Sequence, residues 1–114
     1  MKLPNLERAY VPPEKITRYL LDISHDEGRG KALFYFQVGF SLVQWEELAQ
    51  ALIRHAQEHE VSKAEMTRFG TRYVVEGTLK TPSGRNVQLR SVWFISNGEP
   101  QPRLVTAYPR EEDD

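Results

Sequence analysis

The N-terminal part of the chain places its apolar residues at helical spacing. Pro12 and Pro13 can open a helix, because the first turn of a helix has no use for a proline N–H. Apolar residues then recur at i, i+3, i+4 and i+7, which is one helical face: Ile16, Tyr19, Leu20 and Ile23. The pattern predicts a first helix that ends before the glycine-containing run 24–31, SHDEGRGK.

Two further helices follow in the pattern. The second is short and carries Ala32, Leu33 and Phe36, and Gly39 is placed as its C-terminal cap. The third begins near Ser41, which has the S-x-x-Q spacing of a capping box. Its apolar residues continue at helical spacing: Trp45, Leu48, Ala49, Leu52 and Ala56. We expect this third helix over roughly residues 42 to 59.

From about residue 61 the pattern changes to a period of two, which is typical of strands. The run 71–80, TRYVVEGTLK, alternates Tyr73, Val75, Gly77 and Leu79 on one face, and the run 85–95 alternates Val87, Leu89, Ser91, Trp93 and Ile95. The TPSG between them has turn chemistry, so these runs should form an antiparallel hairpin. RLVTAYP, 103–109, predicts another long strand. Helices before strands predict an α+β fold, with about three N-terminal helices on one face of a twisted antiparallel sheet of about four strands.

The composition of the chain limits its possible domain organisation and cellular location. At 114 residues the chain should form one domain over residues 1–110, followed by a flexible acidic tail, 111–114. The net charge is -1, but without the four carboxylates of the tail the 15 basic groups exceed 12 acidic ones, a net charge of +3. The absence of cysteine excludes disulfides and thiolate zinc sites. No apolar run has the length of a signal peptide or a membrane span, so we expect a cytoplasmic protein.

Several chemically capable residues are assigned to structural roles. His55 and His59 have the i, i+4 spacing that can chelate a metal, but RHAQEHE is typical of a solvated helix face. Trp45 and Trp93 lie on apolar faces and should be core, and Lys15 is expected to be a surface residue of the first turn. The chain has no nucleotide-binding glycine loop, so we expect no metal and no other cofactor.

His25 is the strongest candidate for chemistry. It lies in the glycine-containing connection close to Arg29 and Lys31. An imidazole beside cations suits phosphate chemistry, because the imidazole can take a proton while the cations stabilise charge on the phosphate oxygens. The alternative is that His25 caps the first helix and that Lys31 is only solvated.

The last strand offers a second set of candidates. Arg103, Thr106 and Tyr108 can each contact a phosphate. By alternation Thr106 and Tyr108 share a face with Leu104, and Arg103 lies on the other unless twist or a bulge brings it round. The alternative is structural, with Tyr108 half-buried in the core and Thr106 a good strand former.

In combination these segments resemble one bacterial family, the domain-of-unknown-function family 6883. The resemblance covers nearly the whole chain, from residue 3 to residue 109. It rests on the order and spacing of K-x-x-x-YLL at 15–21, H-x-x-G-x-x-KA-x-F at 25–34, GF at 39–40, YVVEG at 73–77 and VWFI…PRLVTAYP at 92–109. The family is similar to the nuclease toxin fold of barnase, EndoU, colicin-type tRNases and RelE-type toxins.

The resemblance implies a metal-independent endoribonuclease of toxin type. RNA would be its substrate, cleaved through a 2′,3′-cyclic phosphate, and an antitoxin or immunity protein would be its partner. His25 would be the general acid or base, and Lys31 would hold the phosphate or stabilise the transition state. Arg103 would make bidentate contacts to the phosphate, while Thr106 and Tyr108 would orient the phosphate or help move a proton. The competing hypothesis is a noncatalytic protein-interaction module, immunity-like or regulatory, on a nuclease-derived fold.

Overall fold

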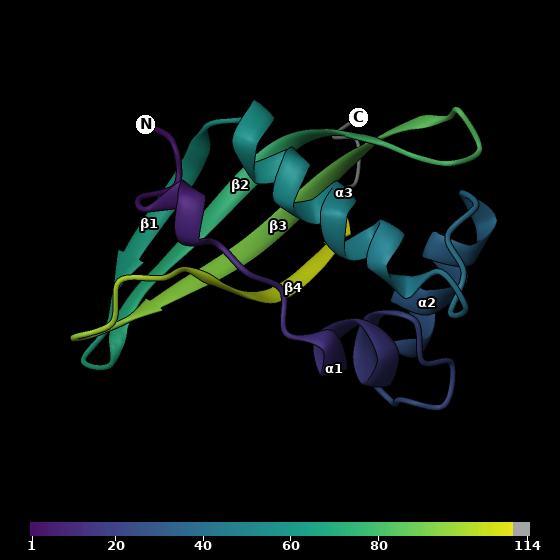
Figure 1. Ribbon diagram of the computed structural model, residues 1–114, viewed down its shortest axis with the longest axis horizontal. Coiled ribbons are helices and arrows are strands. Elements are labelled where there is room, and N and C mark those ends of the chain that lie inside the picture. Colours follow the sequence, from purple (N-terminus) through teal and green to yellow (C-terminus); the bar gives the residue numbers. More distant parts are fainter. Residues whose placement is uncertain (111–114) are drawn as a thin grey trace.

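The computed structural model describes residues 1–110 and consists of a helical N-terminal half followed by a four-stranded antiparallel sheet (Figure 1). The helical elements are η1 (Leu6–Arg8), α1 (Pro13–Lys15), the π-helical η2 (Ile16–Leu20), α2 (Arg29–Gln37) and α3 (Trp45–Glu58). The strands are β1 (Val61–Met66), β2 (Gly70–Lys80), β3 (Asn86–Ser96) and β4 (Arg103–Pro109), in the spatial order β1-β2-β3-β4. The α+β prediction is confirmed. The acidic tail expected at 111–114 lies outside the described residues.

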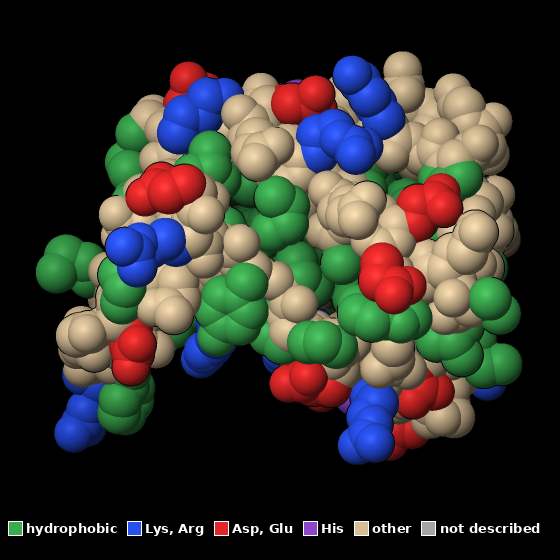
Figure 2. Space-filling view, in the orientation of Figure 1, with side chains coloured by type: hydrophobic (Ala, Val, Ile, Leu, Met, Phe, Trp, Pro, Cys, Tyr) green, Lys and Arg blue, Asp and Glu red, His purple; other side chains and the backbone are tan. Residues whose placement is uncertain are grey.

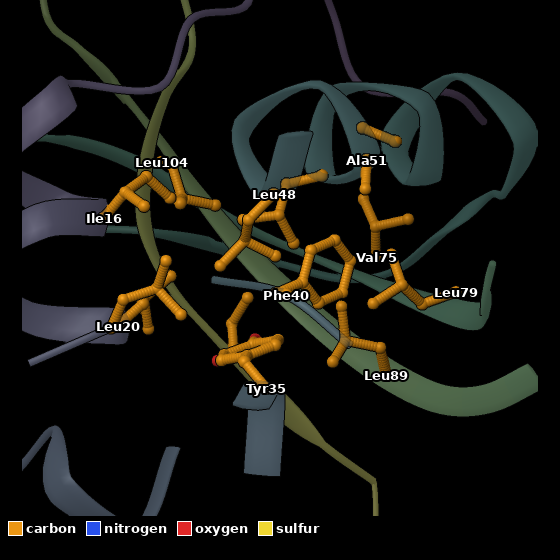
Figure 3. Close-up of a cluster of buried hydrophobic side chains, with 14 of the residues drawn as sticks. Ile16, Leu20, Tyr35, Phe40, Leu48, Ala51, Val75, Leu79, Leu89 and Leu104 are labelled. Carbon is orange, nitrogen blue, oxygen red and sulfur yellow. The ribbon is translucent and has the colours of Figure 1, made fainter. Parts of the chain in front are cut away.

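The hydrophobic core lies between the helices and one face of the sheet, across which α3 runs (Figure 1). The period-two pattern correctly identified the inward positions of the two central strands: Val75 and Leu79 on β2, and Leu89 and Trp93 on β3, are buried. We call this helix-covered side the inner face and the other side the outer face. The helical elements add further side chains to the same cluster (Figure 3), among them Ile16, Leu20, Tyr35, Phe40, Leu48 and Ala51.

The first helical segment is shorter than its pattern predicts. Ile16 and Leu20 are buried as expected, but Ile23 lies beyond the end of η2 and is 51% exposed. The last turn is widened, and the N–H of Leu21 bonds the carbonyl of Ile16 at 2.8 Å. A helix continued to Ile23 would have had regular α-helical spacing, which the π-turn interrupts.

The second helix buries Ala32, as predicted, and in addition a side chain that the pattern did not indicate. Leu33 and Phe36 of α2 remain 45% and 37% exposed, whereas Tyr35 is fully buried. The Tyr35 hydroxyl donates a 2.7 Å hydrogen bond to the carbonyl of Ala107 on β4, and burial raises the pKa of this phenol. An aromatic residue with a satisfied hydroxyl can thus replace a purely apolar one in the core. Gly39 ends the helix at φ 102°, as its position predicts.

The third helix begins three residues later than predicted. Ser41 Oγ accepts the N–H of Gln44 at 3.2 Å, which is the expected serine contact, but the helix proper starts at Trp45. Leu42 and Val43 therefore lie in the connection to α3, 49% and 91% exposed.

The prediction of a solvated face for His55 is wrong. His55 is 1% exposed and joins a buried chain of polar groups between α3 and the sheet. Its Nε2 lies 3.0 Å from the carbonyl of Gly77, and its Nδ1 lies 3.0 Å from Ser91 Oγ. Trp93 Nε1 donates to the same Ser91 oxygen at 2.9 Å. One tautomer satisfies every group, with Trp93 donating to Ser91, Ser91 to His55 and His55 to Gly77, so none of the buried groups has to bear the roughly 1–3 kcal/mol cost of lacking a partner.

The second histidine of the i, i+4 pair is also used structurally. His59 Nε2 donates to the carbonyl of Thr78 at 2.8 Å, and its ring packs against Gly77, where a Cβ would lie 2.3 Å from ring atoms. Over residues 1–110 no three histidine, aspartate or glutamate side chains are grouped as metal ligands. In the same part of the chain no helix has the length and apolar character needed to cross a membrane.

We predict that His55 makes stability fall on acidification. Burial lowers the pKa of His55 below its usual value, so near pH 6.5 the unfolded chain takes up a proton that the folded protein does not. Stability is therefore lost as the pH falls below about 6.5, by at most about 1.4 kcal/mol per pH unit for this one group. Urea unfolding at about pH 7.5 and about pH 5.5 should show a larger loss for the wild type than for His55→Gln, in which this site cannot titrate. Equal losses in the two proteins would contradict the prediction.

Candidate functional site

A bulge in β4 places the three candidate residues of this strand on one face of the sheet. Both Leu104 and Ala107 are fully buried although they are three residues apart, and the register with β3 shifts between them. Arg103, Thr106 and Tyr108 therefore pair with β3 residues that alternate along the outer face: Phe94, Val92 and Arg90. Opposite residues of an antiparallel pair point to the same side. Because of the bulge, Leu104 points to the inner face, and Arg103 points to the outer face together with Thr106 and Tyr108.

The N-terminal helical segment meets the edge of the sheet at Thr106. Figure 1 shows α1 lying beside β4, and the hydroxyl of Tyr19 on η2 lies 2.8 Å from Thr106 Oγ1. An open groove of about 520 Å³ lies here, lined among others by Lys15, Tyr19, His25 and Thr106. We call it the β4-edge groove. Two of the predicted residues, His25 and Thr106, are thus brought together from positions far apart in the sequence.

Two lysines lie near the phenol ring of Tyr19: Lys15, which lines the groove, and Lys31 beside it. Lys31 Nζ lies 5.4 Å and Lys15 Nζ 5.7 Å from the centre of the Tyr19 ring, within the range of cation–π attraction. Lys31 Nζ also donates to the carbonyl of Glu27 at 3.3 Å, which fixes its position above the loop. The groove and the lysine beside it therefore offer two ammonium groups and one hydroxyl proton to an anion such as phosphate, because the hydroxyls of Tyr19 and Thr106 bond each other. Glu14 and Glu27 line the groove as well.

His25 is held by its own loop. Its ring lies 5.0 Å from the Tyr19 ring, and its Nδ1 accepts the backbone N–H groups of Glu27 and Gly28, both at 3.0 Å. Because Nδ1 is an acceptor, the single proton of the neutral ring is on Nε2, assigned from these bonds. His25 thus caps the turn at residues 25–28 that precedes α2 (Arg29–Gln37), not the end of the first helix. A cap on the turn before α2 thus takes the place of the expected cap on the first helix, and the site hypothesis remains open, because Nε2 takes no part in the cap.

The loop that carries His25 has a specific need for glycine. Gly28 packs so closely on η2 that a Cβ there would lie 2.2 Å from the carbonyl oxygen of Tyr19. Asp22 closes the other end of the loop by accepting the N–H of Ser24 at 2.9 Å, and its bonds to Ser24 hold the pKa of Asp22 below its usual value. The H-x-x-G spacing therefore has a physical reason: His25 caps Gly28 while Gly28 lets the loop rest on Tyr19.

Arg103 and Tyr108 lie on the same face as Thr106 but outside the β4-edge groove. The Arg103 guanidinium stacks 5.4 Å from the centre of the Phe94 ring, in a hollow of about 260 Å³ that Tyr10 also lines. Tyr108 lies beyond Thr106 in a third hollow, of about 420 Å³, beside Arg90. The structure thus gives one predicted residue of β4 to each of three hollows, not all three to one.

Sequence reasoning missed two residues of the groove. Tyr19 was assigned to the apolar face of the first helix, and Lys15 to its solvated surface, yet both line the groove with His25. Their i, i+4 spacing on one helix was the available signal, since such a pair shares a helix face.

Comparison with known proteins identifies a family and one similar fold. The family model described as "Domain of unknown function (DUF6883)" matches residues 2–111. No curated protein matches the chain. A chain of the contact-dependent growth inhibition toxin–immunity protein complex from Klebsiella pneumoniae 342 superimposes with a TM-score of 0.71 at 17% identity, covering 95% of this chain and 98% of that one. At this identity the likeness shows a shared fold.

We predict that Gly28→Ala disorganises the β4-edge groove. The added methyl group meets the Tyr19 carbonyl, so the loop 22–28 must move away and His25 loses its place beside Tyr19. Gly30→Ala is a matched control, because a Cβ at Gly30 meets no atom within 4 Å. Side-chain NMR shifts of His25 and Tyr19 should change in Gly28→Ala and stay as in the wild type in Gly30→Ala. Unchanged shifts in both variants would contradict the close packing described here.

Proposed function

The chain belongs to the DUF6883 family, and we propose that it is a metal-independent endoribonuclease of toxin type whose reaction takes place in the β4-edge groove. The convergence of His25, Lys31 and Thr106 around Tyr19 carries the proposal. The fold that the chain shares with a member of a toxin–immunity complex supports it.

The proposed reaction is an internal transfer at one phosphate of RNA. The ribose 2′-oxygen attacks the phosphorus and the bond to the 5′-oxygen breaks, which leaves a 2′,3′-cyclic phosphate and a 5′-hydroxyl. One proton leaves the 2′-hydroxyl and one is taken up by the 5′-oxygen. Negative charge grows on the nonbridging oxygens, where Lys15 and Lys31 would stabilise it. Of the hydroxyls of Tyr19 and Thr106, the one that does not donate to the other would donate a hydrogen bond.

His25 is the proton-transfer group in this proposal. In the described state its Nε2–H can only donate, for example to a nonbridging oxygen. To accept a proton at Nε2, the ring must carry its proton on Nδ1 instead, which displaces the N–H groups of Glu27 and Gly28. Binding of RNA must therefore be accompanied by a small rearrangement of the loop 22–28. Arg103 and Tyr108, on the same face but in neighbouring hollows, would hold phosphates on either side of the reacting one.

A noncatalytic interaction module is the second candidate, and the cap formed by His25 favours it. A histidine whose Nδ1 holds the turn before α2 already has a structural reason to be there. On this hypothesis the groove is the binding surface for a protein partner of immunity or antitoxin type.

The deciding experiment is cleavage of a mixture of tRNA and mRNA in EDTA by the wild type, His25→Asn and His25→Ala. Asparagine can keep the cap, because its Oδ1 stands near the position of Nδ1, but it has no group in place of Nε2. We expect cleavage by the wild type with cyclic phosphate ends, and a loss of about 100-fold or more in His25→Asn at unchanged melting temperature. Lys31→Gln should also lower the rate, whereas Lys80→Gln, the same change on exposed surface at the end of β2, should not.

Other results would reject the proposal. If His25→Asn cleaves like the wild type while His25→Ala is merely less stable, the histidine acts as a cap and the catalytic role is wrong. If no folded form cleaves any RNA, the interaction module becomes the better function.

A further inference from the structure

The outer face of the sheet holds a second cluster of cations that the proposed reaction does not use. It lies in the hollow of about 420 Å³ that contains Tyr108, and its basic members are Lys63, Arg72 and Arg90, with Arg110 at its side. Glu76 is the one acidic side chain that lines this hollow within residues 1–110. Lys63 also pairs with Glu65 at 4.0 Å, so four cations and two carboxylates leave a local charge of +2. The opposite side of the molecule differs, because Figure 2 shows red and blue side chains interspersed over it.

Glu76 organises this cluster and does not neutralise it. Its side chain is only 20% exposed, and the single oxygen Oε2 accepts Arg90 Nε at 2.8 Å and Arg110 Nε at 3.2 Å. Hydrogen bonding from Arg90 keeps the pKa of Glu76 below its usual value, so the carboxylate is charged at neutral pH. Each guanidinium is thus anchored through Nε. Tyr108 also hydrogen-bonds Arg90, and the terminal nitrogens of both arginines still carry N–H groups for another ligand.

The surroundings of the cluster suit a nucleic acid strand. The hydroxyl of Tyr108 lines the hollow, the hydroxyl of Ser62 donates to the carbonyl of Val74 and can still accept, and the buried Val74 side chain forms an apolar floor. Arg72 pairs across the strands with Phe94, on whose ring Arg103 stacks, so basic and aromatic side chains continue along the same face. Phosphate-binding arginines interleaved with aromatic rings are the features with which proteins hold single-stranded nucleic acids.

The cluster is also placed to act together with the β4-edge groove. Tyr108 and Thr106 are two residues apart on β4 and point to the same side, so the hollow and the groove are about 7 Å apart along the strand. A single strand of RNA with one phosphate in the groove can therefore lay the following part of its backbone over the outer face.

We propose that this cluster, which we call the Glu76 site, binds the phosphate backbone of single-stranded RNA, with Glu76 as the residue that positions Arg90 and Arg110. The inference rests on the proposed ribonuclease function for the identity of the strand. It extends that function by a substrate-binding site outside the reacting groove.

Binding to a single-stranded oligoribonucleotide that is 2′-O-methylated throughout tests the site without cleavage, because its blocked 2′-oxygens cannot attack. The dissociation constant is measured over a series of salt concentrations for the wild type, Arg72→Gln and Arg110→Gln. Arg54→Gln on α3 is the matched control, since it removes the same charge from the helix-covered side. We expect the slope of log K against log salt to fall by about 0.7 in each of the first two variants and to stay unchanged in Arg54→Gln.

Glu76→Gln distinguishes a site whose arginines are held in position from a surface that binds RNA only through its positive charge. The substitution removes one negative charge, so a surface that binds by charge alone would bind RNA more tightly. If Glu76 positions the two guanidinium groups, the loss of its carboxylate weakens RNA binding although the net charge of the surface becomes more positive. Arg72 makes no ion pair among residues 1–110, so Arg72→Gln still tests the site should Glu76→Gln fail to fold.

Three outcomes overturn the proposal. The first is an equal salt slope in Arg72→Gln, Arg110→Gln and Arg54→Gln, and the second is that the wild type does not bind the oligonucleotide at low salt. The third is that the wild type binds polyglutamate in place of the oligonucleotide, which would mean an acidic protein partner. Cleavage of unmodified RNA by the same proteins keeps this result separate from the reaction. Cleavage with equal slopes rejects the Glu76 site alone, and the expected slopes without cleavage by the wild type reject the ribonuclease alone.

Discussion

The bulge in β4 is the constraint on which the candidate site depends. Leu104 and Ala107 must both enter the core, where Leu104 joins the main hydrophobic cluster and Ala107 offers its carbonyl to the buried Tyr35. A regular strand cannot bury two residues three positions apart, because its side chains alternate strictly. One extra residue in β4 resolves the conflict. Its consequence is that polar residues on both sides of the bulge face outward together.

The groove at the β4 edge shows how one set of contacts can serve both stability and chemistry. The hydrogen bond between Tyr19 and Thr106 docks the N-terminal segment on the sheet, and the cap from His25 fixes the loop against it. These contacts leave Nε2 of the imidazole outside the cap, with His25 and Lys15 lining the groove and Lys31 close to the Tyr19 ring. A rigid scaffold that holds a few donors in place is what phosphate chemistry requires, because donors that are already oriented need not reorganise during the reaction.

The two faces of the sheet have opposite electrostatic organisation. On the inner face the polar groups of His55 and Ser91 are neutral, buried and fully paired, which keeps the core free of charge. On the outer face Glu76 gathers arginines around one carboxylate oxygen and leaves an excess of positive charge. The helices cover the inner face and exclude water from it, so the outer face is the one available to a charged ligand.

The sequence by itself determined the fold class, the strand alternation of β2 and β3, and the chemical candidates His25, Lys31 and Thr106, since period and residue type are local properties. The burial of Tyr35 in place of Leu33 could not be read from residue type, because only the packing of α2 on β4 supplies a partner for the phenol. His55 was misjudged for the same reason: its charged neighbours indicate solvent, but Ser91 and Gly77 come from strands far along the chain. Which candidates meet was decided by the tertiary structure alone, because a bulge in one strand and the docking of one helical turn set the distances between residues that the sequence keeps apart.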